Sequence, residues 1–288
     1  MTYREKYFEL QKLKNKYLNP TAIKTILMDD GGYKDFYDLL RHFDDEIKDV
    51  NKVNSDVEKI TSGEPLQYVL GYAYFINSNY IVSKDVLIPR QETEQLAVGV
   101  LTQIVKMFGK DPEITIVDIG TGSGVLGIYL KEYFTKSRVI CTDISDKCLK
   151  ISQSNAELHH VDIELKQGDM LEPILGEKDI DVIISNPPYI LDESTVDQQT
   201  LKHEPHLALF ANPVTKYYEE ILTSIDKQLM NDKKFIIAFE IGEDMEESLT
   251  DIIETKYPGI MYRFDKDIYG KTRFLYIVKN EELTDALN

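Results

Sequence analysis

The sequence predicts an α/β protein with a doubly wound, mostly parallel sheet, an antiparallel last strand and a small all-α N-terminal domain. From residue 92 onward, short apolar runs alternate with amphipathic stretches of helix length, as in parallel sheets with right-handed crossovers. The last connection, 267–271, is too short for a crossover, so the last two strands are expected to pair antiparallel. Residues 1–62, by contrast, show only helical spacing.

The all-α domain is predicted to cover residues 1–72. Apolar side chains recur there at helical spacing, for example at Tyr3, Tyr7 and Leu10. Asn19-Pro20 and Asp30-Gly31-Gly32 interrupt this pattern, as expected between helices. We therefore expect several short helices.

A β-hairpin connector is predicted at residues 73–91. Gly63-Glu64-Pro65 and Gly71 mark turns before it. Aromatic and polar residues then alternate from Tyr72 to Val82, which is the pattern of a hairpin. Leu87-Ile88-Pro89-Arg90 closes the connector.

The largest domain is predicted to cover residues 92–288. Helices are expected at 92–108, from 125, around 147–158, at 216–229 and at 244–256. Strands are expected at 114–119, 139–143, 163–167, 181–185, 235–241, 261–265 and 274–278.

The composition favours a cytoplasmic protein that binds neither a membrane nor a metal. The chain has 288 residues, enough for two domains, and 42% of them are hydrophobic. No apolar run reaches the ~20 residues of a membrane span, and the first residues lack the apolar region of a signal peptide. Cys141 and Cys148 lack the spacing of metal or redox sites, and His159-His160 is expected to be a solvated helix end.

The net charge of −17 is unevenly distributed. Residues 1–62 hold 11 of the 33 basic and 12 of the 50 acidic residues, so the acidic excess belongs to residues 63–288. Acidic surfaces repel phosphate backbones, so stable nucleic-acid binding is not expected and a basic protein partner fits better. Solubility alone would explain the charge equally well.

The most informative motif is Asn186-Pro187-Pro188-Tyr189, which directly follows the apolar run 181–185. Open α/β sheets place chemistry at the carboxyl ends of their strands. The prolines keep this corner out of helical geometry, so its carbonyl oxygens and the Asn186 amide point in fixed directions. Two such acceptors suit the two hydrogens of a planar NH₂ group, on which Tyr189 could pack. The predicted target is an amide or an exocyclic amine, and a simple strand-exit turn is the alternative.

A glycine-rich loop, Gly120-Thr121-Gly122-Ser123-Gly124, follows the predicted strand 114–119. Glycines let the backbone turn sharply and let a ligand lie close to it. Asp143 ends the next strand and could accept hydrogen bonds from ribose hydroxyls. These residues predict a nucleotide-type cofactor site.

Asp118, two residues before the loop, favours S-adenosylmethionine over NAD. Its carboxylate could meet an ammonium group, whereas it would repel a pyrophosphate. After the third strand, Asp169 could accept a hydrogen bond from an adenine amine, and Met170 could pack on the ring. The alternatives are turn or helix caps for Asp118 and Asp143, and a core role for Met170.

With these motifs placed, the sequence from Gly63 onward resembles the HemK/PrmC family, the peptide-chain release factor glutamine methyltransferases. The order of the motifs agrees throughout. The resemblance rests on Gly63-Glu64-Pro65, Tyr68, Gly71, Phe75, Leu87-Ile88-Pro89-Arg90, Glu92-Thr93-Glu94, the segment 118–124, Asp143, Ser185 with the motif at 186–189, Glu204-Pro205, Ala208-Leu209, Ala211, Glu240-Ile241-Gly242, Asp267 and Gly270-Lys271-Thr272-Arg273.

The resemblance implies a class I, Rossmann-like methyltransferase with an N-terminal substrate-recognition domain. Such an enzyme transfers a methyl group from S-adenosylmethionine to the glutamine amide of the Gly-Gly-Gln motif in class I peptide chain release factors, leaving S-adenosylhomocysteine. A monomer is expected. Family binding positions carry over onto 120–124, Asp143, Met170 and Asn186, with Asn186, Pro187 and Tyr189 as catalytic residues and 186–189 as the substrate site. Family members often have an aromatic residue where Met170 stands, so stacking on adenine is expected to be softer here.

Three other functions stay open on sequence alone. A nucleic-acid adenine methyltransferase also presents an Asn-Pro-Pro-Tyr corner to an NH₂ group, but it needs a basic groove. A glutamine methyltransferase acting on a ribosomal protein is a close relative of the favoured reading. The third is a non-catalytic cofactor-binding protein. The long connection 191–213 is expected to form part of the substrate wall.

Overall fold

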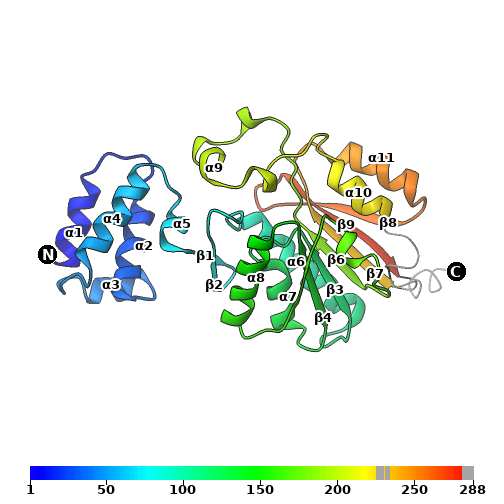
Figure 1. The fold of residues 1–288 in the computed structure, drawn as a ribbon, viewed down its shortest axis with the longest axis horizontal. Helices are drawn as coiled ribbons and strands as arrows, with labels where there is room; N and C mark the ends of the chain where they lie inside the picture. The colour runs from blue at the N-terminus through cyan, green and yellow to red at the C-terminus, as the bar shows by residue number, and fades with distance from the viewer. Residues whose placement is uncertain (225–229, 231–233, 281–288) are drawn as a thin grey trace. The chain divides into compact units, whose positions relative to one another are not determined.

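The computed structural model describes residues 1–224, 230 and 234–280 (Figure 1). The chain separates into two compact units. The first holds Met1–Tyr72 together with Asp197–His203, and the second holds Ala73–Val196 and the chain from Glu204 onward. Among the described helices, none combines the length and the apolar character needed to cross a lipid bilayer.

The first unit is helical, as predicted from the spacing of its apolar residues. Thr2 and Glu5 form a capping box at the start of the first helix. Asn19 caps the second helix, Pro20 occupies its first turn, and Gly32 ends it with a φ of +69°. The helices are α1 (Tyr3–Gln11), α2 (Pro20–Gly31), α3 (Phe36–Arg41), α4 (Val50–Thr61) and α5 (Leu66–Leu70), with a core that includes Tyr3, Leu10, Ile23, Leu27, Leu39, Val53 and Ile60.

The short helix α5 lies where only turns were predicted. Pro65 precedes it and Gly71 ends it in the left-handed region, with a φ of +82°. The turn residues were read correctly, but the five residues between them form one helical turn. The predicted hairpin follows as β1 (Tyr72–Phe75) and β2 (Ser78–Ile81).

The second unit contains the predicted doubly wound sheet. Its helices are α6 (Gln91–Phe108), α7 (Val125–Tyr133), α8 (Asp146–Leu158), α10 (Lys216–Ser224) and α11 (Glu246–Lys256). Its strands are β3 (Thr115–Ile119), β4 (Arg138–Asp143), β5 (Glu164–Gln167), β6 (Val182–Ser185), β7 (Lys234–Glu240), β8 (Met261–Lys266) and β9 (Thr272–Asn280). Element ends differ from the predictions by one or two residues, and positions 225–229 of the predicted helix 216–229 lie outside the described residues.

The strand order is β5-β4-β3-β6-β7-β9-β8. Strands β3 to β7 pair in parallel, whereas β9 runs antiparallel to both β7 and β8. The predicted antiparallel pairing of the last two strands is therefore confirmed. The chain changes direction across the sheet between β3 and β6, which makes their carboxyl ends the topological switch point.

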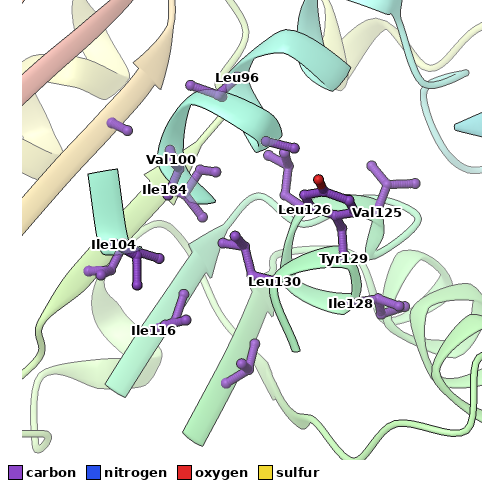
Figure 2. Close-up of a cluster of buried hydrophobic side chains, with 14 of the residues drawn as sticks. Leu96, Val100, Ile104, Ile116, Val125, Leu126, Ile128, Tyr129, Leu130 and Ile184 are labelled. Carbon is purple, nitrogen blue, oxygen red and sulfur yellow. The ribbon is translucent and has the colours of Figure 1, made fainter. Parts of the chain in front are cut away.

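Strands send alternate side chains to opposite faces of a sheet. In this sheet both sets of side chains are apolar, and helices cover each face. Ile116 and Ile184 pack with α6 and α7 on one face (Figure 2). Val117 and Ile183 pack with α10 and α11 on the other. This apolar core fixes the strands whose ends carry the polar motifs.

Candidate active site

The candidate site lies at the carboxyl ends of β3 and β6. Ile119 is in register with Thr142 on one side and Ser185 on the other. The Ser185 hydroxyl also donates to the Ile119 carbonyl oxygen over 2.7 Å. The register therefore places the glycine loop 120–124 between Asp143 and Asn186. The sequence had predicted only that each of these motifs follows a strand.

The glycine loop has backbone conformations that favour glycine. Gly120, Gly122 and Gly124 have φ values of +68°, +57° and +84°. The Gly122 N–H donates to Asp143 Oδ2 over 2.9 Å, and the Thr121 N–H donates to the Thr142 carbonyl. Apart from the adjoining residues, no atom of the described part of the chain lies within 4 Å of a Cβ built at Gly120 or Gly122. A ligand can therefore approach the backbone there.

Asp118 is buried beside this loop, with 1% of its surface exposed. Its Oδ2 accepts hydrogen bonds from the Thr121 hydroxyl at 2.6 Å and the Gly127 N–H at 3.0 Å. In the described part of the chain, Oδ1 has no partner. Burial raises the pKa of Asp118 to about 6. The carboxylate orders the turn, and one oxygen remains available.

Asp143 also holds backbone groups at the strand end. Besides Gly122, its carboxylate accepts the Ser145 N–H at 2.9 Å, and burial raises its pKa. The turn-capping alternative is therefore seen at both Asp118 and Asp143. Asp143 keeps 8% of its surface exposed, which is where a ligand hydroxyl could reach it.

Asp169 and Met170 follow β5, next to Asp143 in the sheet register. Both are partly exposed, and the Asp169 N–H contacts Glu172 Oε2 at 3.4 Å. Met170 has a φ of +40° and packs against the core cluster shared with α10 and α11. A core contact for Met170 is thus present, and its contact with adenine remains a prediction.

The Asn-Pro-Pro-Tyr corner is held through two side chains. Asn186 Nδ2 donates to Thr93 Oγ1 over 3.1 Å. The Tyr189 hydroxyl donates to Glu240 Oε1 over 3.1 Å, and burial raises the pKa of Tyr189. Pro187 is buried, whereas Pro188 is partly exposed. Asn186 and Tyr189 therefore have fixed orientations at the strand end.

Thr93 and Glu240 were not predicted as site residues. The Thr93 hydroxyl donates to Glu240 Oε2 over 2.7 Å, and both residues are buried. Burial raises the pKa of Glu240, against the hydrogen bonds from Thr93 and Tyr189. An acidic residue at the end of an otherwise apolar strand was the sequence signal for Glu240.

The long segment after the corner closes back on itself. The Ile190 N–H donates to the Leu209 carbonyl at 3.0 Å, and the Ala211 N–H donates to the Ile190 carbonyl at 2.9 Å. Between them lie η2 (Glu193–Thr195), α9 (Gln198–His203) and η3 (His206–Ala208). The predicted substrate wall therefore has its own secondary structure, and its contact with a substrate stays a prediction.

Glu204 anchors this segment to the connector before α6. Its side chain is 2% exposed and pairs with Arg90 at 2.5 Å. Its second oxygen accepts the Ile88 N–H at 3.1 Å. Two motifs that the sequence placed in one family pattern are thereby joined across the fold.

The expectation of a solvated His159 was wrong. Its side chain is 6% exposed and stacks on Tyr80 with ring centroids 4.1 Å apart. It also contacts Glu132 at 3.0 Å and the Asn79 carbonyl at 3.1 Å. The helix end packs on the hairpin, which the helical spacing alone does not show.

Comparison with known proteins identifies the kind of enzyme. The methyltransferase small domain matches residues 100–224. The "Release factor glutamine methyltransferase" of Staphylococcus aureus is 36% identical over 83% of this chain and 85% of its own length. The protein of that name from Enterococcus faecalis is 32% identical over 93% of this chain and 98% of its own.

Solved structures agree on the fold. The catalytic domain of hMettl16 in complex with MAT2A 3′UTR hairpin 6 aligns with a TM-score of 0.53 at 14% identity, covering 80% of this chain and 82% of that one. The protein is therefore a methyltransferase with a class I, Rossmann-like fold, and its family and fold imply an S-adenosylmethionine-type methyl donor. With identities above 30% over most of both chains, the protein belongs to the release factor glutamine methyltransferase family.

Proposed function

We propose that this enzyme methylates the side-chain amide nitrogen of the glutamine in the Gly-Gly-Gln motif of class I peptide chain release factors. The name shared by its relatives supports this reaction. The observation that carries it is the Asn186 amide: its Nδ2 is already bonded to Thr93, so Oδ1 is left as an acceptor for a substrate NH₂ group.

The methyl donor in this proposal is S-adenosylmethionine, and S-adenosylhomocysteine is its product. The donor supplies an electrophilic methyl group on a sulfonium. The glycine loop fits it, because Gly120 and Gly122 face open space and present backbone that a ligand can approach. Asp143 would hold the ribose, and Asp169 and Met170 would contact the adenine. Asp118, whose buried Oδ1 has no partner among the described residues, would meet the ammonium group of the donor.

The chain's own residues would orient the acceptor nitrogen. Asn186 Oδ1 and the Pro187 carbonyl accept the two amide hydrogens, which fixes the direction of the nitrogen. These oxygens also stabilise positive charge that develops on the nitrogen, as oxyanion-hole donors stabilise negative charge. Tyr189, held by Glu240, packs on the amide face. No strong base is required, because a methylated, protonated amide is very acidic.

The N-terminal helical residues 1–72 are assigned to substrate recognition, with 73–91 as connector and 92–288 as the methyltransferase domain. Most of the acidic excess lies outside residues 1–62, which suits a basic partner. Release factors act in translation, so the proposal places the enzyme in the cytoplasm, where it would act as a monomer.

Methyl transfer from labelled S-adenosylmethionine to a purified class I release factor tests this proposal. Label is expected on the wild-type release factor and not on a variant whose Gly-Gly-Gln glutamine is replaced by alanine. Parallel reactions with ribosomal proteins and with RNA compare the other acceptors. Equal labelling of the glutamine-less variant, or labelling only of RNA or ribosomal protein, would contradict the proposal.

A further inference from the structure

We propose that Thr93 and Glu240 are positioning residues that decide which way the Asn186 amide faces, an inference that rests on the proposed function. The three side chains form one continuous hydrogen-bonded chain. It joins the end of β6, the first turn of α6 and the end of β7. The strand register explains the meeting of two of them, since Ser185 pairs with Phe239 and the next residues are Asn186 and Glu240.

The direction of each hydrogen bond follows from the chemistry of Glu240. In its ionised form, which the hydrogen bonds from Thr93 and Tyr189 favour, this carboxylate accepts hydrogen bonds and donates none. The Thr93 hydroxyl has one proton, which it gives to Glu240 Oε2 over 2.7 Å. Its oxygen can then only accept from Asn186, so Nδ2 must face Thr93 and Oδ1 must face away. Without the carboxylate, the hydroxyl could donate to Oδ1 instead, which would turn the amide around.

The second oxygen of Glu240 acts on the other side of the corner. It accepts the Tyr189 hydroxyl at 3.1 Å, which orients that ring. Only 1% of Glu240 is exposed, and a buried charge is costly unless its partners compensate. A glutamine of the same size would avoid the charge, but its amide could both donate and accept. The carboxylate permits one arrangement only.

Replacement of Thr93 can change the orientation of the Asn186 amide without disturbing the fold. In Thr93→Val, a substitution of equal size, kcat is expected to fall about 10- to 100-fold, by analogy with the hydrogen-bond partners that orient metal ligands. The Kd for S-adenosylmethionine should not change. Thr93→Ser keeps the hydroxyl and should retain most of the wild-type kcat.

Tyr218→Phe is the matched control. The Tyr218 hydroxyl is fully buried and donates to the Glu240 backbone carbonyl at 2.8 Å, outside the chain that reaches Asn186. This variant should lose stability while its kcat stays at the wild-type value. A wild-type kcat for Thr93→Val, a Thr93→Ser variant as slow as Thr93→Val, or equal kcat losses in Thr93→Val and Tyr218→Phe would overturn the inference.

A second readout does not depend on catalysis. The side-chain NH₂ resonances of Asn186, assigned by their loss in Asn186→Ala, should exchange slowly with water in the wild type and in Thr93→Ser. They should exchange rapidly in Thr93→Val and Glu240→Gln. If the wild type fails to methylate release factors but shows this pattern, the proposed function fails and the positioning stands. Equal exchange in all variants removes the positioning role.

Discussion

The glycine loop 120–124 and the corner 186–189 end neighbouring strands, yet they are held in different ways. Gly120, Gly122 and Gly124 have no Cβ, and two buried carboxylates hold the loop: Asp143 through the Gly122 N–H and Asp118 through the Thr121 hydroxyl. The corner contains two prolines, and its Asn186 and Tyr189 side chains are held by hydrogen bonds. This difference fits the proposed function, in which the loop presents backbone to the methyl donor and the corner fixes one side chain as the acceptor for the substrate amide.

The largest test of this division is Asn186→Ala. If the corner serves only the acceptor amide, turnover should fall by about 10²–10³, the usual effect of losing one preorganised charge-stabilising group (~3–4 kcal/mol). The affinity for S-adenosylmethionine, measured by calorimetry, should stay near the wild-type value. Methyl transfer at the wild-type rate would show that the corner does not orient the substrate.

Gly122→Ala tests the loop, where the expected loss is in affinity for the methyl donor. The new methyl group meets no protein atom within 4 Å, so it occupies the open space beside the backbone. Affinity for the methyl donor should fall on the order of tenfold, about 1.4 kcal/mol. Gly259→Ala is the control, because Gly259 also has a positive φ, +84°, with open space around it. Both variants carry similar backbone strain, about 1–2 kcal/mol, so equal donor affinities would refute a ligand at the loop.

Asp118→Asn tests whether the buried carboxylate beside the loop titrates near neutral pH. The pKa of Asp118 is raised to about 6, above its ordinary value of 3.8, so the folded protein binds a proton more tightly than the unfolded chain. At pH 7 the ionised Asp118 therefore lowers the free energy of unfolding, and this destabilisation disappears as the pH falls through about 6. Relative to Asp118→Asn, the wild type should gain roughly 1 kcal/mol in free energy of unfolding between pH 7 and pH 5.

Urea denaturation of both proteins at the two pH values measures this difference. A constant difference would mean that Asp118 does not titrate in this range. Donor binding adds a second measurement, because a carboxylate that pairs with an ammonium group should bind it less well at pH 5 than at pH 7. The Asp118→Asn variant should show no such dependence.

The sequence predicted most elements because their signals are local. Apolar runs gave the strands, and the helical spacing of apolar residues gave the helices. The caps at Thr2 and Asn19 became apparent only in the structure. The position of β9 between β7 and β8 was beyond reach, since the packing of the whole sheet decides strand neighbours. The helix α5 was missed for another reason: its five residues, Leu66–Leu70, are too few to show a helical period.

The candidate site was predictable only in part. The glycine loop, Asp143 and Asn186 each follow a predicted strand, and parallel strands end at one edge of a sheet. The contact between Thr93 and Glu240 spans 147 positions and joins a helix start to a strand end. No local pattern links such a pair. The buried His159 is a similar case, because its partner Asn79 lies 80 positions away.

The location of β9 affects how the protein is synthesised. β7 ends in the positioning carboxylate, and its neighbour on one side is Thr272–Asn280, which follows both β7 and β8 in the chain. While the ribosome is still translating the preceding residues, that edge of the nascent sheet has no strand to pair with, and open edges recruit other chains. The strand that ends in Glu240 therefore keeps one unpaired edge until Thr272–Asn280 has been synthesised.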